Sequence, residues 1–167
     1  MINIEKDIEY KNIVSHILDN EEFNKMKNIS HHDTNRFDHS LKVSYYSHKI
    51  AKTLKLDSED VARAGLLHDF FMTDTNVSVI KRLKSAINHP KYAALKSEEI
   101  FGISEKEKDI IKTHMFPLNL NVPKYTESWL VTLVDKGVAL KEQAYRYGYK
   151  FAYLANMYLL FLMNSIK

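Results

Sequence analysis

Glycine and proline are scarce in this chain, and their scarcity limits the folds that it can adopt. Only four glycines and three prolines occur among 167 residues, too few for the turns of a many-stranded sheet. The long stretches between them are rich in Leu, Lys, Glu, Ala and Met, which favour helices. We therefore expect an all-α fold, a compact bundle of about six to eight helices, with residues 1–167 in a single domain.

Apolar periodicity and capping residues locate the expected helices. Ser104 and Glu107 have the spacing of a capping box. Pro90 suits the first turn of a helix, and Gly148 is expected to separate the last two helices. The expected helices span about residues 2–27, 38–56, 58–71, 90–101, 104–114, 126–147 and 151–166.

The net charge and the absence of cysteine limit the partners and the kinds of metal site that we expect. The formal net charge is only +3 and basic residues are interleaved with acidic ones, so no nucleic-acid partner is expected. Because the chain has no cysteine, a metal can be held only by histidine and carboxylate side chains. The first residues, MINIEKDIEYKN, contain acids and no apolar run, so we expect no secretory signal and a cytoplasmic location.

The most apolar stretch of the chain is residues 151–166. It is shorter than the roughly 20 residues needed to cross a bilayer, and it contains Asn156 and Asn164. We therefore expect no membrane span. The stretch is predicted to be a core helix or an interface in a homo-oligomer.

Six potential metal ligands are spread along the middle of the chain. Neutral imidazole and carboxylate groups hold Mn, Fe, Zn or Ni in proteins. A buried carboxylate is costly unless it is paired or bound to a metal. The candidates are His39, His68, Asp69, His89, His114 and Asp135.

Helical phase predicts which of these side chains face inward. Asp135 lies with Val131 and Val138 on one apolar face of its helix. His39 shares a face with apolar residues of its own helix, and His114 follows two isoleucines at the end of another. His89, just before a proline, is the least constrained by local pattern.

The alternative to metal binding is that these residues have structural roles in the core. A buried histidine such as His39 is more often a satisfied core residue than a ligand. Asp135 could instead be neutralised by Arg36 or Arg63. His48, on the face of its helix opposite to His39, is expected at the surface.

Two His-Asp dipeptides occur, and their contexts differ. His32-Asp33 lies in a polar loop, whereas His68-Asp69 closes an apolar helix. Gly65 lies one turn before Asp69, where the absent side chain would let another helix or a metal approach closely. The second dipeptide is therefore the candidate.

The order His39, His68-Asp69 and Asp135 resembles the HD-domain superfamily of metal-dependent phosphohydrolases, over about residues 35–140. The segments HDFFMTD and THMFP are similar to those of small, uncharacterised bacterial members. The resemblance implies an HD-like helical fold and two divalent metals per chain, with Fe or Mn favoured over Ni, Zn or Mg. It implies a first metal held by His39, His68, Asp69 and Asp135, and a second held by His89 and His114, with Asp69 bridging.

The resemblance also implies an activity. The expected substrate is a small anionic phosphorylated molecule, a phosphate ester or a nucleotide, attacked by a metal-activated hydroxide. Asp69 and Arg36 are the candidate catalytic residues. Arg36, one turn before His39, is a candidate phosphate clamp, and the alternative is a solvated or capping arginine. Lys136 is expected to face solvent. The residues after the His-Asp pair lack the Gly-Tyr-Pro signature of relatives that cleave cyclic dinucleotides, so that activity is not expected.

Two other functions are compatible with the same ligands. Some two-metal relatives are di-iron oxygenases, and His and carboxylate ligands do not separate iron from manganese or nickel. A non-catalytic metal-binding module, assembled through the apolar C-terminal helix, is the third hypothesis.

Overall fold

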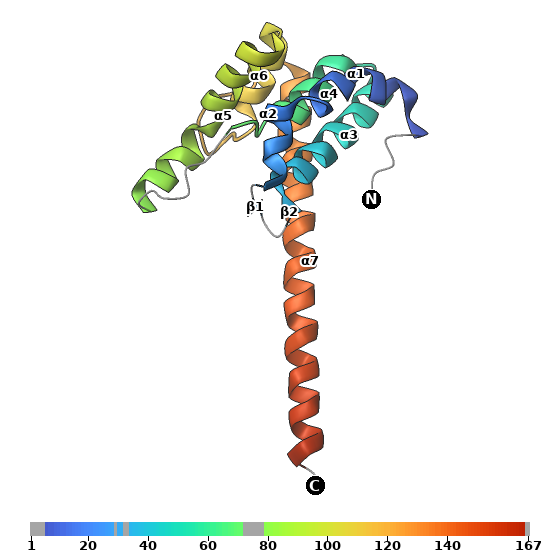
Figure 1. Ribbon diagram of the computed structural model, residues 1–167, viewed down its shortest axis with the longest axis vertical. Helices are drawn as coiled ribbons and strands as arrows, with labels where there is room; N and C mark the ends of the chain where they lie inside the picture. The colour runs from blue at the N-terminus through green and yellow to red at the C-terminus, as the bar shows by residue number, and fades with distance from the viewer. Residues whose placement is uncertain (1–5, 29, 32–33, 72–78, 166–167) are drawn as a thin grey trace.

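The computed structural model describes residues 6–28, 30–31, 34–71 and 79–165 (Figure 1). The all-α prediction is confirmed: these residues form seven α-helices, with one antiparallel pair of two-residue strands. The elements are α1 (Ile8–Leu18), α2 (Glu21–Asn24), the 3-10 helix η2 (Lys25–Asn28), β1 (Ser30–His31), β2 (Thr34–Asn35), α3 (Arg36–Leu54), α4 (Ser58–Leu67), α5 (Val79–Phe101), α6 (Glu105–Thr113) and α7 (Thr126–Ser165).

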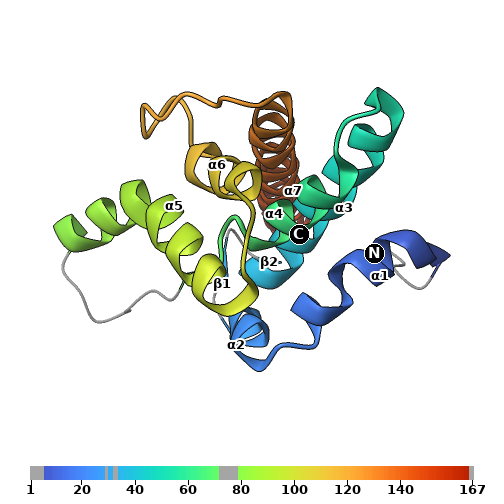
Figure 2. The ribbon, with the colours of Figure 1, turned by 90° about the horizontal axis from the view of Figure 1, so that it is seen from above.

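The core forms around α4. This helix packs against α1, α3 and α6, while α7 packs against α3 and α6 (Figure 2). Burying these apolar faces is the main stabilising term of such a fold. Fully buried side chains of the core include Val14, Val43, Leu66, Leu67, Ile110, Ile111 and Val131.

The contact between α3 and α4 depends on a glycine. A Cβ added at Gly65 would lie 3.0 Å from the Cα of Ser44, so the two helix backbones approach closely there. The Ser44 hydroxyl donates to the Ala62 carbonyl at 2.6 Å and accepts from the Tyr10 hydroxyl at 2.7 Å. The close approach expected at Gly65 is therefore to another helix, and a buried polar chain joins α1, α3 and α4.

Capping residues begin several helices. The Asp57 carboxylate accepts the N–H of Asp60 at the start of α4. The predicted capping box at α6 is confirmed: Ser104 Oγ accepts from the Glu107 N–H at 3.0 Å, and Glu107 accepts from the Ser104 N–H at 2.6 Å.

The first predicted helix and the helix expected to begin at Pro90 differ from the observed ones. The long first helix is divided after Leu18, because Asn20 caps the new helix α2 by accepting the N–H of Phe23 at 3.1 Å. The prediction that Pro90 begins a helix is wrong, since α5 already begins at Val79 and has Pro90 inside it. Proline removes one backbone donor, and the helix continues across this single loss.

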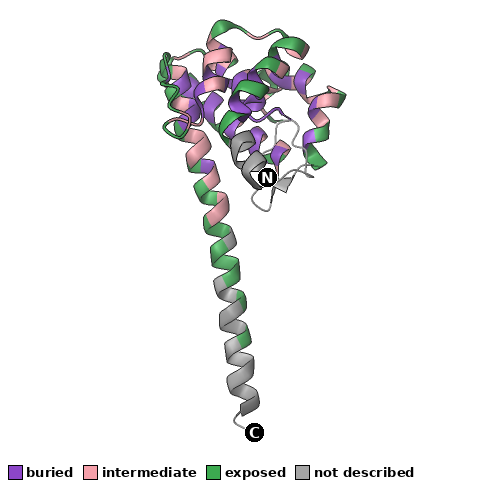
Figure 3. Cartoon of the chain, turned by 90° about the vertical axis from the view of Figure 1, so that its left-hand side faces the viewer, coloured by how far each residue is buried: buried purple, intermediate pink, exposed green. Residues whose placement is uncertain are grey.

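The C-terminal third is one helix of 40 residues, so the prediction of a break at Gly148 is wrong. A helical glycine costs only about 1 kcal/mol relative to alanine, and Ala144, Arg146 and Lys150 nearby favour helix, so one glycine does not end it. The first half of α7 packs on α3, α4 and α6, whereas the rest projects away from the domain (Figures 1 and 3). In the part of the chain that the structure describes, no helix has the length and apolar character needed to span a membrane.

Candidate metal centre

Six side chains from the ends and faces of five helices converge inside the domain. His39 comes from α3, His89 from α5 and Asp135 from α7. His68 and His114 are the C-cap residues of α4 and α6. All are buried except Asp135, whose side chain is 13% exposed. Donor atoms within 4.8 Å of one another form three overlapping sets: His39, His68 and Asp69; His68, His114 and Asp135; Asp69, His89 and His114.

Asp135 is the centre of one half of the cluster. Its Oδ1 lies 2.9 Å from His39 Nε2 and 3.6 Å from His68 Nε2. Arg63, considered as a structural partner for this carboxylate, pairs instead with Glu107 at 2.6 Å. Asp135 is thus in contact with two imidazoles, as a metal-ligand set requires.

Asp69 is the centre of the other half. Its Oδ1 lies 3.0 Å from His89 Nε2 and 3.8 Å from His114 Nε2, and its Oδ2 lies 3.8 Å from His68 Nε2. The Nε2 atoms of His89 and His114 are 2.9 Å apart. Two ring nitrogens at this distance share a proton or a cation, because their lone pairs repel. Asp69 therefore contacts histidines of both halves, the place that a bridging carboxylate would occupy.

Backbone carbonyls orient two of the imidazoles. His68 Nδ1 donates to the Gly65 carbonyl at 2.8 Å, and His114 Nδ1 donates to the Ile111 carbonyl at 2.8 Å. Because a carbonyl only accepts, Nδ1 carries a proton in both residues and Nε2 points into the cluster, where it can bind a metal when it carries no proton. This is the tautomer in which histidine binds a metal through Nε2.

Glu142 belongs to the site and was not identified from the sequence. It accepts the Nδ1 proton of His39 at 2.9 Å and pairs with Lys42 at 2.7 Å. Its side chain is only 8% exposed. Glu142 lies two turns after Asp135, so both project from the same side of α7, and this spacing is the signal that could have located it.

The ionisation of the cluster follows from burial and mutual contact. Burial would raise the pKa of Asp69 and of Asp135, but neighbouring imidazoles hold both pKa values well below the usual range. Burial opposes protonation of His39, yet its hydrogen bonds to Asp135 and a second carboxylate raise its pKa to about 9. Burial lowers the pKa of His114 to about 3, so this imidazole is neutral at pH 7. The cluster holds ionised carboxylates beside imidazoles, a donor set suited to a divalent metal.

Arg36 lies beside the cluster and is held by Phe71. Its guanidinium carbon is 3.9 Å from the centre of the Phe71 ring, and Nη1 donates to the Phe71 carbonyl at 2.7 Å. The Phe71 ring is itself stacked on His89, with centroids 4.8 Å apart. Arg36 thus supports the position of a candidate ligand, and its role as a phosphate clamp stays a prediction.

Lys136 and His48 differ from expectation. Lys136 does not face solvent freely, since its partly buried Nζ donates to the His114 carbonyl at 3.0 Å, at the end of α6. His48 is fully buried: its Nδ1 lies 3.0 Å from the Ser58 carbonyl and its ring packs on Tyr10. The surface prediction failed because α1 and the start of α4 cover the face of α3 opposite to His39. The other dipeptide, residues 32–33, lies outside the described residues.

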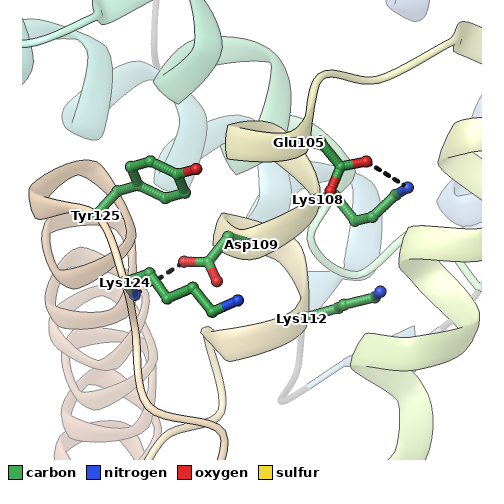
Figure 4. A pocket seen from close by; sticks show the side chains of 6 residues that line it. All are labelled: Glu105, Lys108, Asp109, Lys112, Lys124 and Tyr125. Atoms are coloured by element: carbon green, nitrogen blue, oxygen red, sulfur yellow. Dashed lines mark hydrogen bonds and ion pairs between the residues drawn. The ribbon is translucent and has the colours of Figure 1, made fainter.

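A separate pocket of about 120 Å³ lies between α6 and the segment before α7 (Figure 4). In it the Asp109 carboxylate accepts the Lys124 N–H at 3.0 Å and the Ser128 hydroxyl at 2.7 Å, which ties the start of α7 to α6. None of the six candidate ligands lines it. Its lining residues are Glu105, Lys108, Asp109, Lys112, Lys124 and Tyr125.

Comparison with known proteins identifies the family. The model of the HD domain family matches residues 36–140, an interval that contains all six clustered side chains and more than half of the chain. No curated protein and no solved structure gives a significant match to the chain. With its buried histidine and aspartate cluster, this chain therefore belongs to the HD domain family, whose members are commonly metal-dependent hydrolases.

Proposed function

We propose that this protein is a metal-dependent phosphohydrolase that cleaves a phosphate ester or a nucleotide. The observation that carries the proposal is the convergence of four imidazole Nε2 atoms on two carboxylates, the buried Asp69 and the partly buried Asp135. Divalent metals bound there would lower the pKa of a coordinated water and stabilise negative charge on a phosphoryl group. The proposed ligands are His39, His68, Asp69 and Asp135 for one metal, and Asp69, His89 and His114 for the other.

The side chains present fit such metals. Nitrogen and oxygen donors without sulfur suit Mn and Fe, which we favour over Ni, Zn and Mg. The hydrogen bonds at Nδ1 of His68 and His114 keep both Nε2 atoms available as donors. The ionised carboxylates of Asp69 and Asp135 supply the negative charge that a pair of cations needs.

Two cationic side chains near the cluster favour an anionic substrate. Arg36 reaches the site from α3 and interacts with the charge of Asp69, and stacking on Phe71 fixes the plane of its guanidinium. Lys136 reaches the end of α6 from α7. A guanidinium has five donors in a planar fork, which suits phosphate oxygens. We infer that Arg36 binds the substrate phosphate and helps to place it against the ligands.

The test compares Asp69→Asn with Asp60→Asn. Asp60 lies on α4, the helix that precedes Asp69, and contacts Ser104 rather than the cluster. Wild-type protein should contain Mn or Fe and release phosphate from a panel of nucleotides and chromogenic phosphoesters. Asp69→Asn should lose both properties, whereas Asp60→Asn should retain them. Phosphate release that survives Asp69→Asn would contradict the proposal, as would a metal-loaded wild type that consumes oxygen but hydrolyses no phosphoester.

A further inference from the structure

We propose that the pocket between α6 and the start of α7 binds the phosphate group of a phosphate monoester, at a site separate from the metal cluster. The proposal does not depend on the enzymatic activity. Four of the lining residues stand at positions i, i+3, i+4 and i+7 of α6, so they share one face of that helix. They are Glu105, Lys108, Asp109 and Lys112. Lys124 extends toward this face from the segment before α7 (Figure 4).

This face of α6 points away from the metal cluster. Ile110 and Ile111 of the same helix are buried in the core. His114 follows Lys112 by two residues, a rotation of about 200° around the helix axis. None of the six candidate metal ligands lines the pocket. A molecule bound there therefore makes no contact with those ligands.

Polar contacts hold the two walls of the pocket together. Asp109 Oδ2 accepts from the Lys124 N–H at 3.0 Å and from the Ser128 hydroxyl at 2.7 Å. The Lys112 carbonyl accepts from Asn119 Nδ2 at 2.9 Å. The segment before α7 is thus tied to α6 at two places. A pocket that is formed before binding reduces the entropy lost when a ligand is ordered.

The volume of the pocket suits a small group. It is about 120 Å³, several times the roughly 30 Å³ that one water occupies in the liquid. Pockets for drug-sized molecules have about 300–1,000 Å³. A phosphate group, which has five heavy atoms, therefore fits, and the rest of an ester would lie outside.

Two of the three lysines in the pocket are available to an anion. Lys108 is neutralised, because its Nζ pairs with Glu98 at 2.6 Å and with Glu105 at 3.0 Å. In the part of the chain that the structure describes, the Nζ atoms of Lys112 and Lys124 make no ion pair and no hydrogen bond. A phosphate monoester carries nearly two negative charges at pH 7, which two ammonium groups would balance.

The positive charge of these lysines extends across the pocket. The pKa of Glu105 is lowered first by its hydrogen bond to Lys108, and the charges of Lys112 and Lys124 lower it further. The start of α7 adds charge of the same sign, because the N-terminal end of a helix is partly positive. Lys124 and Tyr125 directly precede that end. The field in the pocket thus favours an anion.

Tyr125 offers a surface for the organic part of the ester. It lines the pocket and is 38% exposed, so it lies where the pocket meets solvent. Its carbonyl accepts from the backbone N–H groups of Ser128 at 3.1 Å and Trp129 at 3.2 Å, which fixes its backbone at the start of α7. A partly exposed ring can stack with a planar group. An aromatic ester should therefore bind more tightly than an aliphatic one.

Amide chemical shifts in the isotope-labelled full chain locate the binding of two probes, methylphosphonate and phenylphosphonate. Their bond between phosphorus and carbon resists hydrolysis, so turnover does not interfere. Both should shift the amide signals of Lys124 and of α6 in a saturable way, with dissociation constants of about 1 mM or lower. Phenylphosphonate should bind at least about fivefold more tightly, because its ring can stack on Tyr125. Equal affinities would contradict the role of Tyr125.

Three single substitutions remove the same charge at different places. Lys112→Gln and Lys124→Gln should each raise the dissociation constant for methylphosphonate by about tenfold, because each removes a charged hydrogen-bond donor. Lys52→Gln is the control, since Lys52 lies on α3 and pairs with Glu9, outside the pocket. It should change the dissociation constant less than about twofold. An unchanged pattern of amide signals in the free variants checks that all three are folded.

Three results would overturn the proposal. These are a wild type whose pocket amides show no saturable shift, shifts confined to residues around the metal cluster, and equal effects of the three substitutions.

Vesicles distinguish a soluble ester from a lipid headgroup, since phosphatidic acid presents a phosphate monoester at a membrane surface. The full chain is mixed with phosphatidylcholine vesicles that contain phosphatidic acid. Flotation that is lost in Lys112→Gln would identify the headgroup as the source of the phosphate. Saturable phosphonate binding without flotation would identify a soluble ester.

Discussion

Replacing Glu142 with glutamine tests how the cluster holds His39. Glutamine keeps the size of the side chain and an acceptor oxygen, but it removes the negative charge beside His39 Nδ1. That charge makes the imidazole a stronger metal ligand. Lys42, which would lose its partner, is 34% exposed and remains solvated, so its contribution should be small.

The expected magnitude follows from the burial of Glu142. Loss of an outer hydrogen-bond partner of a metal-bound histidine weakens metal binding by about 10- to 100-fold, or about 1.4–2.7 kcal/mol. Because the Glu142 side chain is only 8% exposed, water screens its charge poorly, and we expect the upper part of this range.

The assay is competition for Mn or Zn between metal-free protein and a chromogenic chelator. Glu127→Gln is the control, since Glu127 is also on α7 but lies 3.7 Å from Lys106, outside the cluster. Glu142→Gln should weaken binding while Glu127→Gln leaves it unchanged. A dissociation constant that changes less than about twofold in Glu142→Gln would refute the reasoning.

Two further predictions concern stability. Gly65→Ala should destabilise the fold by about 1–3 kcal/mol in denaturant unfolding, because the added methyl would lie 3.0 Å from Ser44 Cα. Gly137→Ala, with nothing within 4 Å, should be neutral or stabilising by up to about 1 kcal/mol, and equal losses at both sites would count against the packing argument. In EDTA, the melting temperature should be highest near pH 6.5. The raised His39 pKa gives stability that is full below 6.5 and is lost as the pH rises through about 9, whereas the lowered His114 pKa costs stability as the pH falls below 6.5. A melting temperature that rises steadily in EDTA between pH 6.5 and 9 would contradict this pH dependence. With metal bound, the melting temperature should not fall over the same range, because the metal requires deprotonated histidines.

The pattern of residues along one helix was sufficient to predict which side chains point inward where a single helix face is buried. Asp135 lies among valines spaced for one face of a helix, and His39 follows the apolar side of its own helix, so their inward direction could be predicted. Context separated His68-Asp69 from the polar dipeptide at 32–33. The inclusion of His89 came only from family resemblance, and the structure places it 3.0 Å from Asp69.

Features set by tertiary contact could not be predicted in this way. His48 was expected at the surface because helical phase does not show whether another helix packs on that face. In the structure α1 packs there, with Tyr10 against the His48 ring. Glu142 was missed because its partner His39 is distant in sequence and comes from another helix. The uninterrupted course of α7 through Gly148 shows that a single glycine, at a cost of about 1 kcal/mol, is too small a penalty to end a long helix.

We propose that the six converging side chains form a two-metal centre. Metal analysis of the full chain, purified without added metal or oxygen, tests it most directly. We expect about two equivalents of Mn or Fe per chain, and loss of this metal in Asp69→Asn. Protein that is folded but contains no bound metal, and that takes up none from Mn or Fe solutions, would contradict it.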